Sequence, residues 1–219
     1  STGFTGRIVN AGDIRNKGVE VAFNSTPIKT QSGFNWDFDV NFTAYETTVE
    51  QLDVDRISLA GFTSTSSNVI EGEPYGVLYG GRFQRDESGN MIIGSNGWPL
   101  RDPEDGVIGD PNPDWFAGVR NTFSYRGFRL TALLDIRWGG DVWNGTRGVA
   151  NYFGVTQETA DRREVKGYVF DGVTEGGQPN TTPVDFGGAS GGDKWRRYGF
   201  GGLGEEAVED ASWVRLREL

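Results

Sequence analysis

The chain has 219 residues and a formal net charge of -10, from 21 basic and 31 acidic side chains. It contains no cysteine and no histidine, which excludes disulfide bonds, zinc sites with sulfur or imidazole ligands, and catalysis by Ser-His-Asp or Cys-His groups. The acidic balance argues against a nucleic-acid partner, because phosphate binding requires clustered Lys and Arg. No apolar run approaches the ~18 residues that a membrane-spanning helix needs.

Several segments alternate between apolar and polar residues, beginning with residues 19–25 and 34–45 and continuing with residues 115–125 and 128–138. Residues 213–219 form a fifth candidate with less regular alternation. A period of two predicts β-strands. It suits a half-buried strand of a soluble sheet, and equally a strand that has lipid on one side and water on the other.

A tight turn at Arg126-Gly127 predicts a hairpin whose antiparallel pairs run outward from Tyr125 and Phe128 to Trp115 and Trp138. One face of this hairpin holds six pairs with a single polar residue, while the other face carries Ser, Thr, Asp and Arg. Aromatic residues occupy both ends of the apolar face, and aliphatic residues lie between them. Eleven tilted residues rise about 27 Å, which matches the ~25 Å apolar band of outer-membrane barrels.

The connections between these strands alternate between short and long. The first connection and the Arg126-Gly127 turn are short, whereas residues 46–114 and 139–212 form very long connections. This alternation is typical of outer-membrane barrels, which have short periplasmic turns and long extracellular loops. Within the long connections, residues 74–93 predict a hairpin that turns at residues 86–90, and residues 156–165 predict a short helix.

Two groups of carboxylates are candidate sites. The stretch "RDPEDGVIGDPNPD" (101–114) offers oxygen ligands for calcium in an extracellular loop, or else forms a series of Asx and proline turns. Asp37 and Asp39 project from one strand face and could form an acid/base pair, or could simply be solvated or paired with arginines. The acidic residues of the first group are Asp102, Glu104, Asp105, Asp110 and Asp114.

Aromatic residues beside Asn and Arg gather in the second long connection. Such side chains suit a sugar or peptide ligand, through stacking and hydrogen bonds. They suit equally well a contact with a neighbouring loop or a partner protein. The candidate ligand or partner contacts are Trp143, Asn144, Tyr152, Trp195, Arg196 and Tyr198.

Five blocks in sequence order give the chain its resemblance to a known family. They are "NAGDIRNKGVEVAFNSTPI" (10–28), "FNWDFDVNFTAY" (34–45), "GEPYGVLYGGRFQRDESGN" (72–90), "IGDPNPDWFAGVRNTFSYRGFRLTALLDIRWGGDVWN" (108–144) and "EDASWVRLREL" (209–219). With these blocks the chain resembles the SusC/RagA family of TonB-dependent outer-membrane transporters over almost its whole length.

The resemblance implies a 22-stranded antiparallel transmembrane β-barrel in the outer membrane of a Gram-negative bacterium. An amino-terminal plug closes such barrels, and a SusD-like lipoprotein caps the extracellular loops. Glycans or peptides are imported with energy from the TonB complex. Residues 1–219 then form an all-β segment from the late part of the barrel, with about five transmembrane strands. The plug, the TonB box and the last strands are expected outside this chain, because it lacks an initial Met and stops within a predicted strand.

This interpretation assigns a medium to each strand face and no catalytic, cofactor or resident metal site to the chain. The residues expected to face lipid are Trp36, Phe38, Val40, Phe42, Trp115, Val119, Phe123, Leu130, Leu134, Ile136 and Trp138. The residues expected to face the lumen are Asp37, Asp39, Asn41, Arg120, Arg129, Asp135 and Arg137.

Two other classes of protein stay open from the sequence. A soluble β-sandwich that binds carbohydrate would pack the apolar faces against each other and hold sugar in its Trp-rich loops. An enzyme is the third alternative, and it would have to work with a carboxylate pair such as Asp37 and Asp39.

Overall fold

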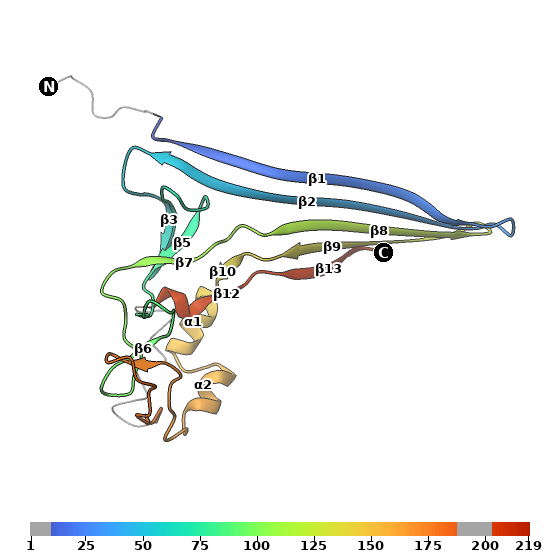
Figure 1. Ribbon diagram of the computed structural model, residues 1–219. Coiled ribbons are helices and arrows are strands. Elements are labelled where there is room, and N and C mark those ends of the chain that lie inside the picture. Colours follow the sequence, from blue (N-terminus) through green and yellow to red (C-terminus); the bar gives the residue numbers. More distant parts are fainter. Residues whose placement is uncertain (1–9, 188–202) are drawn as a thin grey trace.

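The computed structural model describes residues 10–187 and 203–219, and its dominant feature is one long antiparallel sheet with a loop body at one end (Figure 1). The sheet has five strands in the order β1-β2-β8-β9-β13. No helix in the described residues is long and apolar enough to cross a membrane. The strands are β1 (Gly12–Lys29), β2 (Phe34–Leu52), β8 (Trp115–Tyr125), β9 (Phe128–Trp138) and β13 (Trp213–Glu218).

The predicted hairpin is confirmed residue by residue. β8 and β9 have the predicted bounds, and their pairs run from Tyr125 with Phe128 to Trp115 with Trp138. The two-residue turn has φ +46° at Arg126 and +89° at Gly127. These left-handed angles match the twist of the flanking strands, although they cost a non-glycine residue such as Arg126 roughly 1–2 kcal/mol.

β1 and β2 are longer than their apolar alternation predicts. They stay paired from Gly12 and Leu52 down to Lys29 and Asn35. Beyond the alternating part, towards the loop body, an ion pair between Arg15 and Glu50 joins the two strands. Backbone pairing therefore continues after the apolar pattern has ended, and this extension cannot be read from hydrophobicity alone.

The loop body consists of short elements taken from both long connections. The predicted helix is confirmed as α2, with Thr156 as its N-cap, and the predicted turn at residues 86–90 forms. The predicted hairpin reaches only from Gln84 to Ile92, because β5 pairs instead with β4 and β7. The elements are β3 (Ile57–Phe62), β4 (Thr65–Val69), β5 (Val77–Gly80), β6 (Ile92–Ile93), β7 (Gly106–Gly109), β10 (Asp141–Trp143), α1 (Gly145–Tyr152), α2 (Gln157–Arg162), β11 (Val173–Thr174), the 3-10 turn η2 (Gly204–Ala207) and β12 (Val208–Asp210).

The loop body has a hydrophobic core of its own. Trp98, Val184 and Phe186 are buried together, with Val165 and Phe170 packed against them. The rings of Trp98 and Phe186 meet edge to face at 5.7 Å. Residues from both long connections thus meet in one core, although they lie almost ninety positions apart in the chain.

Candidate functional site

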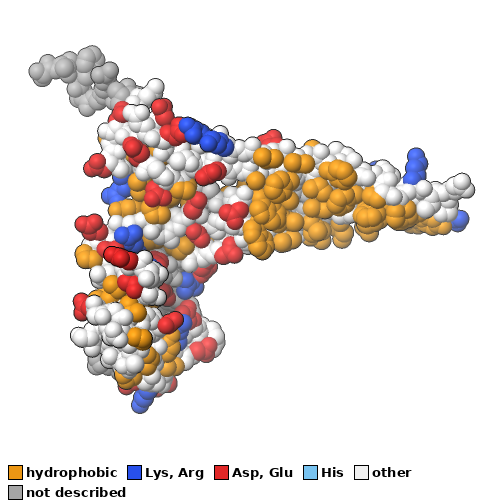
Figure 2. Space-filling view, viewed as in Figure 1, with side chains coloured by type: hydrophobic (Ala, Val, Ile, Leu, Met, Phe, Trp, Pro, Cys, Tyr) orange, Lys and Arg blue, Asp and Glu red, His pale blue; other side chains and the backbone are white. Residues whose placement is uncertain are grey.

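One face of the five-stranded sheet is apolar and exposed. All eleven residues expected to face lipid lie on it, because the register places Val40 opposite Val119 and Val119 opposite Leu134. Their neighbours on β1 and β13 extend the same face with Val19, Val21, Phe23, Val214 and Leu216. The exposed fraction reaches 53% at Leu130 and 63% at Val214. Figure 2 shows the resulting continuous apolar surface between two polar ends.

Aromatic rings border the apolar face at both ends. Towards the loop body, Trp115 stacks on Trp138 with ring centroids 6.0 Å apart, and Phe42 lies 5.8 Å from Trp115. Towards the short turns, Phe123 stacks on Trp36 at 5.9 Å and on Phe34 at 6.4 Å. Such belts are typical of strands that cross a membrane, since amphipathic rings favour the water–lipid boundary.

Asn121 is the single polar residue in the apolar pairs of β8 and β9. Its Oδ1 accepts a hydrogen bond of 3.0 Å from the indole Nε1 of Trp36 on the neighbouring strand. The indole thus supplies a hydrogen-bond partner for the amide oxygen, which lowers the cost of a polar group on an apolar surface. Sequence reasoning could not find this pair, because it needs the β2–β8 register.

The opposite face of the sheet is polar and carries every residue expected to face the lumen. Asp37 accepts a hydrogen bond of 2.8 Å from Thr26 Oγ1, and Asp39 lies opposite Arg120. Asp135 forms an ion pair of 2.9 Å with Arg217. A groove of about 710 Å³ runs along this face and is lined by Asn24, Ser25, Thr26, Asp37, Asp39, Arg120, Thr122, Arg129, Thr131 and Glu218.

Three of the predicted ligand or partner contacts lie in the described part of the loop body, where they make internal contacts. Asn144 caps α1 by accepting from the Arg147 N–H at 2.9 Å, and it donates to Glu209 at 2.9 Å. Trp143 meets the ring of Phe62 at 6.2 Å, and Tyr152 ends α1 beside Phe153. Trp195, Arg196 and Tyr198 lie outside the described residues, so their part in ligand binding stays a prediction.

The acidic stretch 101–114 forms turns and ion pairs. Asp102 pairs with Arg82 at 2.9 Å, and Arg101 pairs with Asp105 at 2.7 Å. The pKa of Asp102 is lowered, chiefly by the backbone N–H of Glu104 and then by Arg82. Within residues 10–187 and 203–219, no group of three acidic residues is placed to hold a metal ion together, and calcium binding by this stretch stays a prediction.

Charged residues of η2 hold the two long connections together. Sequence reasoning missed this link. Glu205 accepts from the backbone N–H of Phe83 at 2.7 Å and forms an ion pair with Arg85. The pKa of Arg85 is raised, mainly by the hydrogen bond that its guanidinium donates to the Glu205 carboxylate. These contacts join residues about 120 positions apart, a separation that leaves no local signal in the sequence.

Arg147 is the centre of a second charged cluster. Its guanidinium bonds the carboxylate of Glu209 and the backbone oxygen of Glu206, and it lies 3.6 Å from Glu158. Burial raises the pKa of the Glu206 side chain. The cluster ties α1, α2, η2 and β12 together.

Comparisons with known proteins agree with this arrangement. No protein-family profile matches the chain. TonB-dependent receptor P26 of Formosa agariphila is 29% identical over 167 residues, and receptor P39 of the same organism is 36% identical over 196 residues; each alignment covers 65% of this chain. The chain spans only 17% and 18% of these two relatives.

Two solved structures share the fold. A structure of the RagAB peptide transporter matches with a TM-score of 0.56 and 16% identity, over 98% of this chain and 23% of that one. A structure of the RagAB peptide importer in a closed-closed state gives a TM-score of 0.55 and 18% identity, over 94% of this chain and 22% of that one. The all-β architecture of antiparallel barrel strands with long loops is thereby confirmed.

Proposed function

The chain is homologous to one part of the TonB-dependent receptors, and from that premise we propose that it forms one wall of a closed outer-membrane barrel that imports nutrients. In this proposal the apolar face of the sheet meets lipid and the polar face meets the lumen. The loop body lies on the extracellular side. The whole barrel is several times longer than this chain, as its relatives are.

The observation that carries the proposal is the exposed apolar face with its two aromatic belts. Phe23 is 53% exposed and Leu216 is 54% exposed, at opposite edges of the sheet. A monomeric soluble protein rarely leaves so large a contiguous apolar surface in water. Contact with lipid hydrocarbon removes the free-energy cost of exposing this surface to water, without any protein partner.

The rival β-sandwich needs a second sheet across the apolar face. Among the described residues, the remaining sheets lie in the loop body at the end of the long strands, and none covers that face (Figure 1). β1 and β13 are also edge strands with free backbone groups along one side. Barrel closure by further strands would pair both edges.

The transported substrate is proposed to be an oligosaccharide or a peptide, with a SusD-like lipoprotein over the loops and energy from the TonB complex. The names of the relatives support the TonB dependence, and a structure of similar fold is described as a peptide transporter. No enzymatic step is proposed, since the curated relatives are receptors.

The test is to express the full-length protein that contains this chain with an epitope tag in the loop body. We expect to recover the protein in the outer-membrane fraction. In SDS gels it should migrate more slowly after heating, as folded barrels do. Disruption of the gene should abolish growth on one class of oligosaccharide or peptide, and complementation should restore it. A protein recovered in the soluble fraction would contradict the proposal.

A further inference from the structure

The tip of the sheet that carries the short turns has basic side chains and no acidic ones. Residues 26–36 and 123–132 contain Lys29, Arg126 and Arg129 but no Asp or Glu. In the described part of the chain these three cations form no ion pair with a carboxylate.

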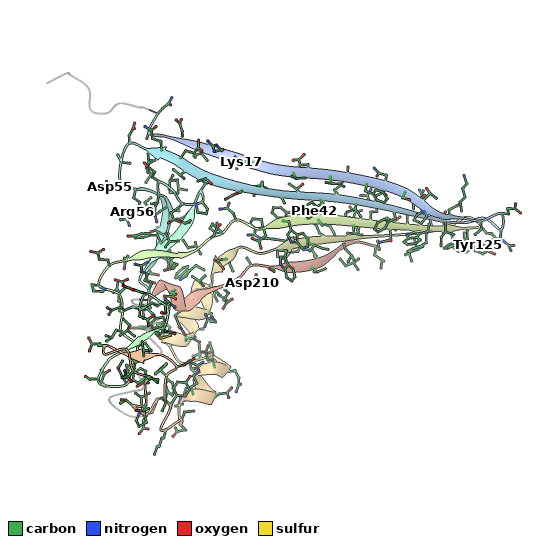
Figure 3. The ribbon with its side chains drawn as sticks, in the orientation of Figure 1. Lys17, Phe42, Asp55, Arg56, Tyr125 and Asp210 are labelled. Atoms are coloured by element: carbon green, nitrogen blue, oxygen red, sulfur yellow. The ribbon has the colours of Figure 1, made fainter. Side chains whose placement is uncertain are left out.

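The opposite end of the apolar face carries an excess of acidic residues. Residues 205–210 contain four acidic residues and no Lys or Arg. Asp53 and Asp55 follow directly after the end of β2. Figure 3 places Asp210 and Asp55 at the loop end and Tyr125 at the far tip. The charge along the sheet is therefore asymmetric across the apolar band.

Arg126 stands where the turn disfavours it. Its φ of +46° lies in the left-handed region, and the first position of such a turn favours Asn, Asp or Gly. A residue that breaks a local preference without an internal partner points to an external one. Among the described residues, its side chain forms no hydrogen bond or ion pair and lies over the ring of Tyr125, with the guanidinium carbon 5.1 Å from the ring centroid.

Exposed aromatic rings surround this arginine. Tyr125 is 42% exposed and Phe128 is 82% exposed, both on the apolar face. An aromatic ring places itself at the boundary between hydrocarbon and headgroups. A cation held on that ring then lies at the depth of the phosphates.

We propose that the short-turn end of the sheet, formed by Arg126 and the rings of Tyr125 and Phe128, binds the headgroups of anionic phospholipids. The inference rests on the proposed function, since it requires this end to lie at a membrane surface. Arg126 supplies the specificity, because a guanidinium binds phosphate oxygens in a bidentate manner.

The test uses the full-length protein, purified in a neutral detergent and titrated with phosphatidylglycerol or phosphatidylcholine under native mass spectrometry. Arg126→Asn should lower the association constant for phosphatidylglycerol about fivefold, since one cation near an anionic headgroup contributes on that order. Phosphatidylcholine binding should not change. Because Asn is favoured in this turn, the variant should fold at least as well as the parent.

Three further variants separate charge from bonding geometry and from position. Arg126→Lys should retain only part of the binding, because an ammonium group keeps the charge but not the bidentate geometry. Arg56→Asn is the matched control, because Arg56 also lies over a tyrosine, 4.3 Å from the Tyr79 ring, but at the loop end (Figure 3). It should leave lipid binding unchanged, and so should Lys29→Gln, because Lys29 pairs with Asn35 on the polar face of the sheet.

Unchanged phosphatidylglycerol binding by Arg126→Asn would overturn the inference, as would an equal loss of both lipids or full displacement of the lipid by glycerol phosphate. A protein that folds in detergent as a heat-modifiable barrel but shows no preference for the anionic lipid contradicts this inference alone. A protein that stays soluble without detergent contradicts the proposed function as well.

Discussion

The long sheet and the loop body satisfy their apolar side chains in opposite ways. In the loop body, Phe186 is only 2% exposed and packs against Trp98 and Val184. On the sheet, Phe128 and Leu130 are 82% and 53% exposed. The loop body therefore carries its own core, whereas the sheet depends on an apolar medium and on strands that continue it at both edges.

This difference separates two kinds of stability within one chain. Substitutions in the core of the loop body should act locally, through packing. Substitutions on the sheet should act through the transfer of a side chain into the surrounding medium. The four predictions that follow use this contrast, beginning with the largest expected effect.

Phe186→Ala should destabilise the loop body by about 3–5 kcal/mol, because it removes a buried ring and leaves a cavity. Hydrogen exchange of the full-length protein should show faster exchange around residues 98 and 165–186, with unchanged protection in β8 and β9. Val169→Ala is the matched control, since Val169 is 43% exposed. Equal loss of protection in the sheet would contradict the separation of the two regions.

Val119→Arg should destabilise the barrel by about 2–4 kcal/mol, because it places a charge on the lipid face near mid-depth. The measurement is urea unfolding of the full-length protein in liposomes, together with the folded fraction after refolding. Asn41→Arg lies at the same depth on the polar face, one register position away from the Val40–Val119 pair. It should have little effect, and equal damage by both variants would remove the assignment of the faces.

Glu205→Gln should loosen the contact between the two long connections by about 1–2 kcal/mol, because it removes a charge-assisted bond to Arg85. Limited proteolysis should cleave the loop body faster while the strands stay resistant. Unchanged cleavage would show that the apolar core alone holds the two connections together.

Glu206→Gln should stabilise the loop body instead of destabilising it, and its effect on stability should be the smallest of the four. Burial raises the pKa of Glu206, so the folded loop body binds this proton more tightly than the unfolded one. Stability from this group is then present at low pH and falls as pH rises from the ordinary glutamate pKa through the raised value. The variant should stabilise the loop body at neutral pH and remove this pH dependence, while a profile identical to that of the parent would contradict the prediction.

The central hairpin could be predicted from the sequence because its determinants are local. A two-residue turn fixes the register, and the period of two then assigns every side chain of β8 and β9 to a face. The same reasoning placed Asp37 and Asp39 on the polar face of β2. The turns of the acidic stretch after Arg101 could also be predicted, since Asx turns depend on neighbouring residues.

The loop body could not be predicted, because distant residues determine it. α1 has two glycines in eight residues and depends on its Asn144 cap and on the contacts of Arg147 with η2 and β12. The bond from Phe83 to Glu205 and the Trp98–Phe186 contact likewise join distant segments. No periodicity in the sequence predicts such contacts, because they depend on tertiary packing.

The most direct test of the account is a cysteine scan of β8 in the full-length protein. This chain contains no cysteine, so once any cysteine elsewhere in the full-length protein is replaced by serine, single cysteines at positions 117 to 123 can be spin-labelled in liposomes and probed with oxygen and with a water-soluble nickel complex. The account predicts a period of two, with positions 117, 119 and 123 accessible to oxygen and positions 118, 120 and 122 accessible to nickel. Uniform accessibility, or protection of both sets from both reagents, would contradict the claim that one face of this sheet meets lipid and the other meets water.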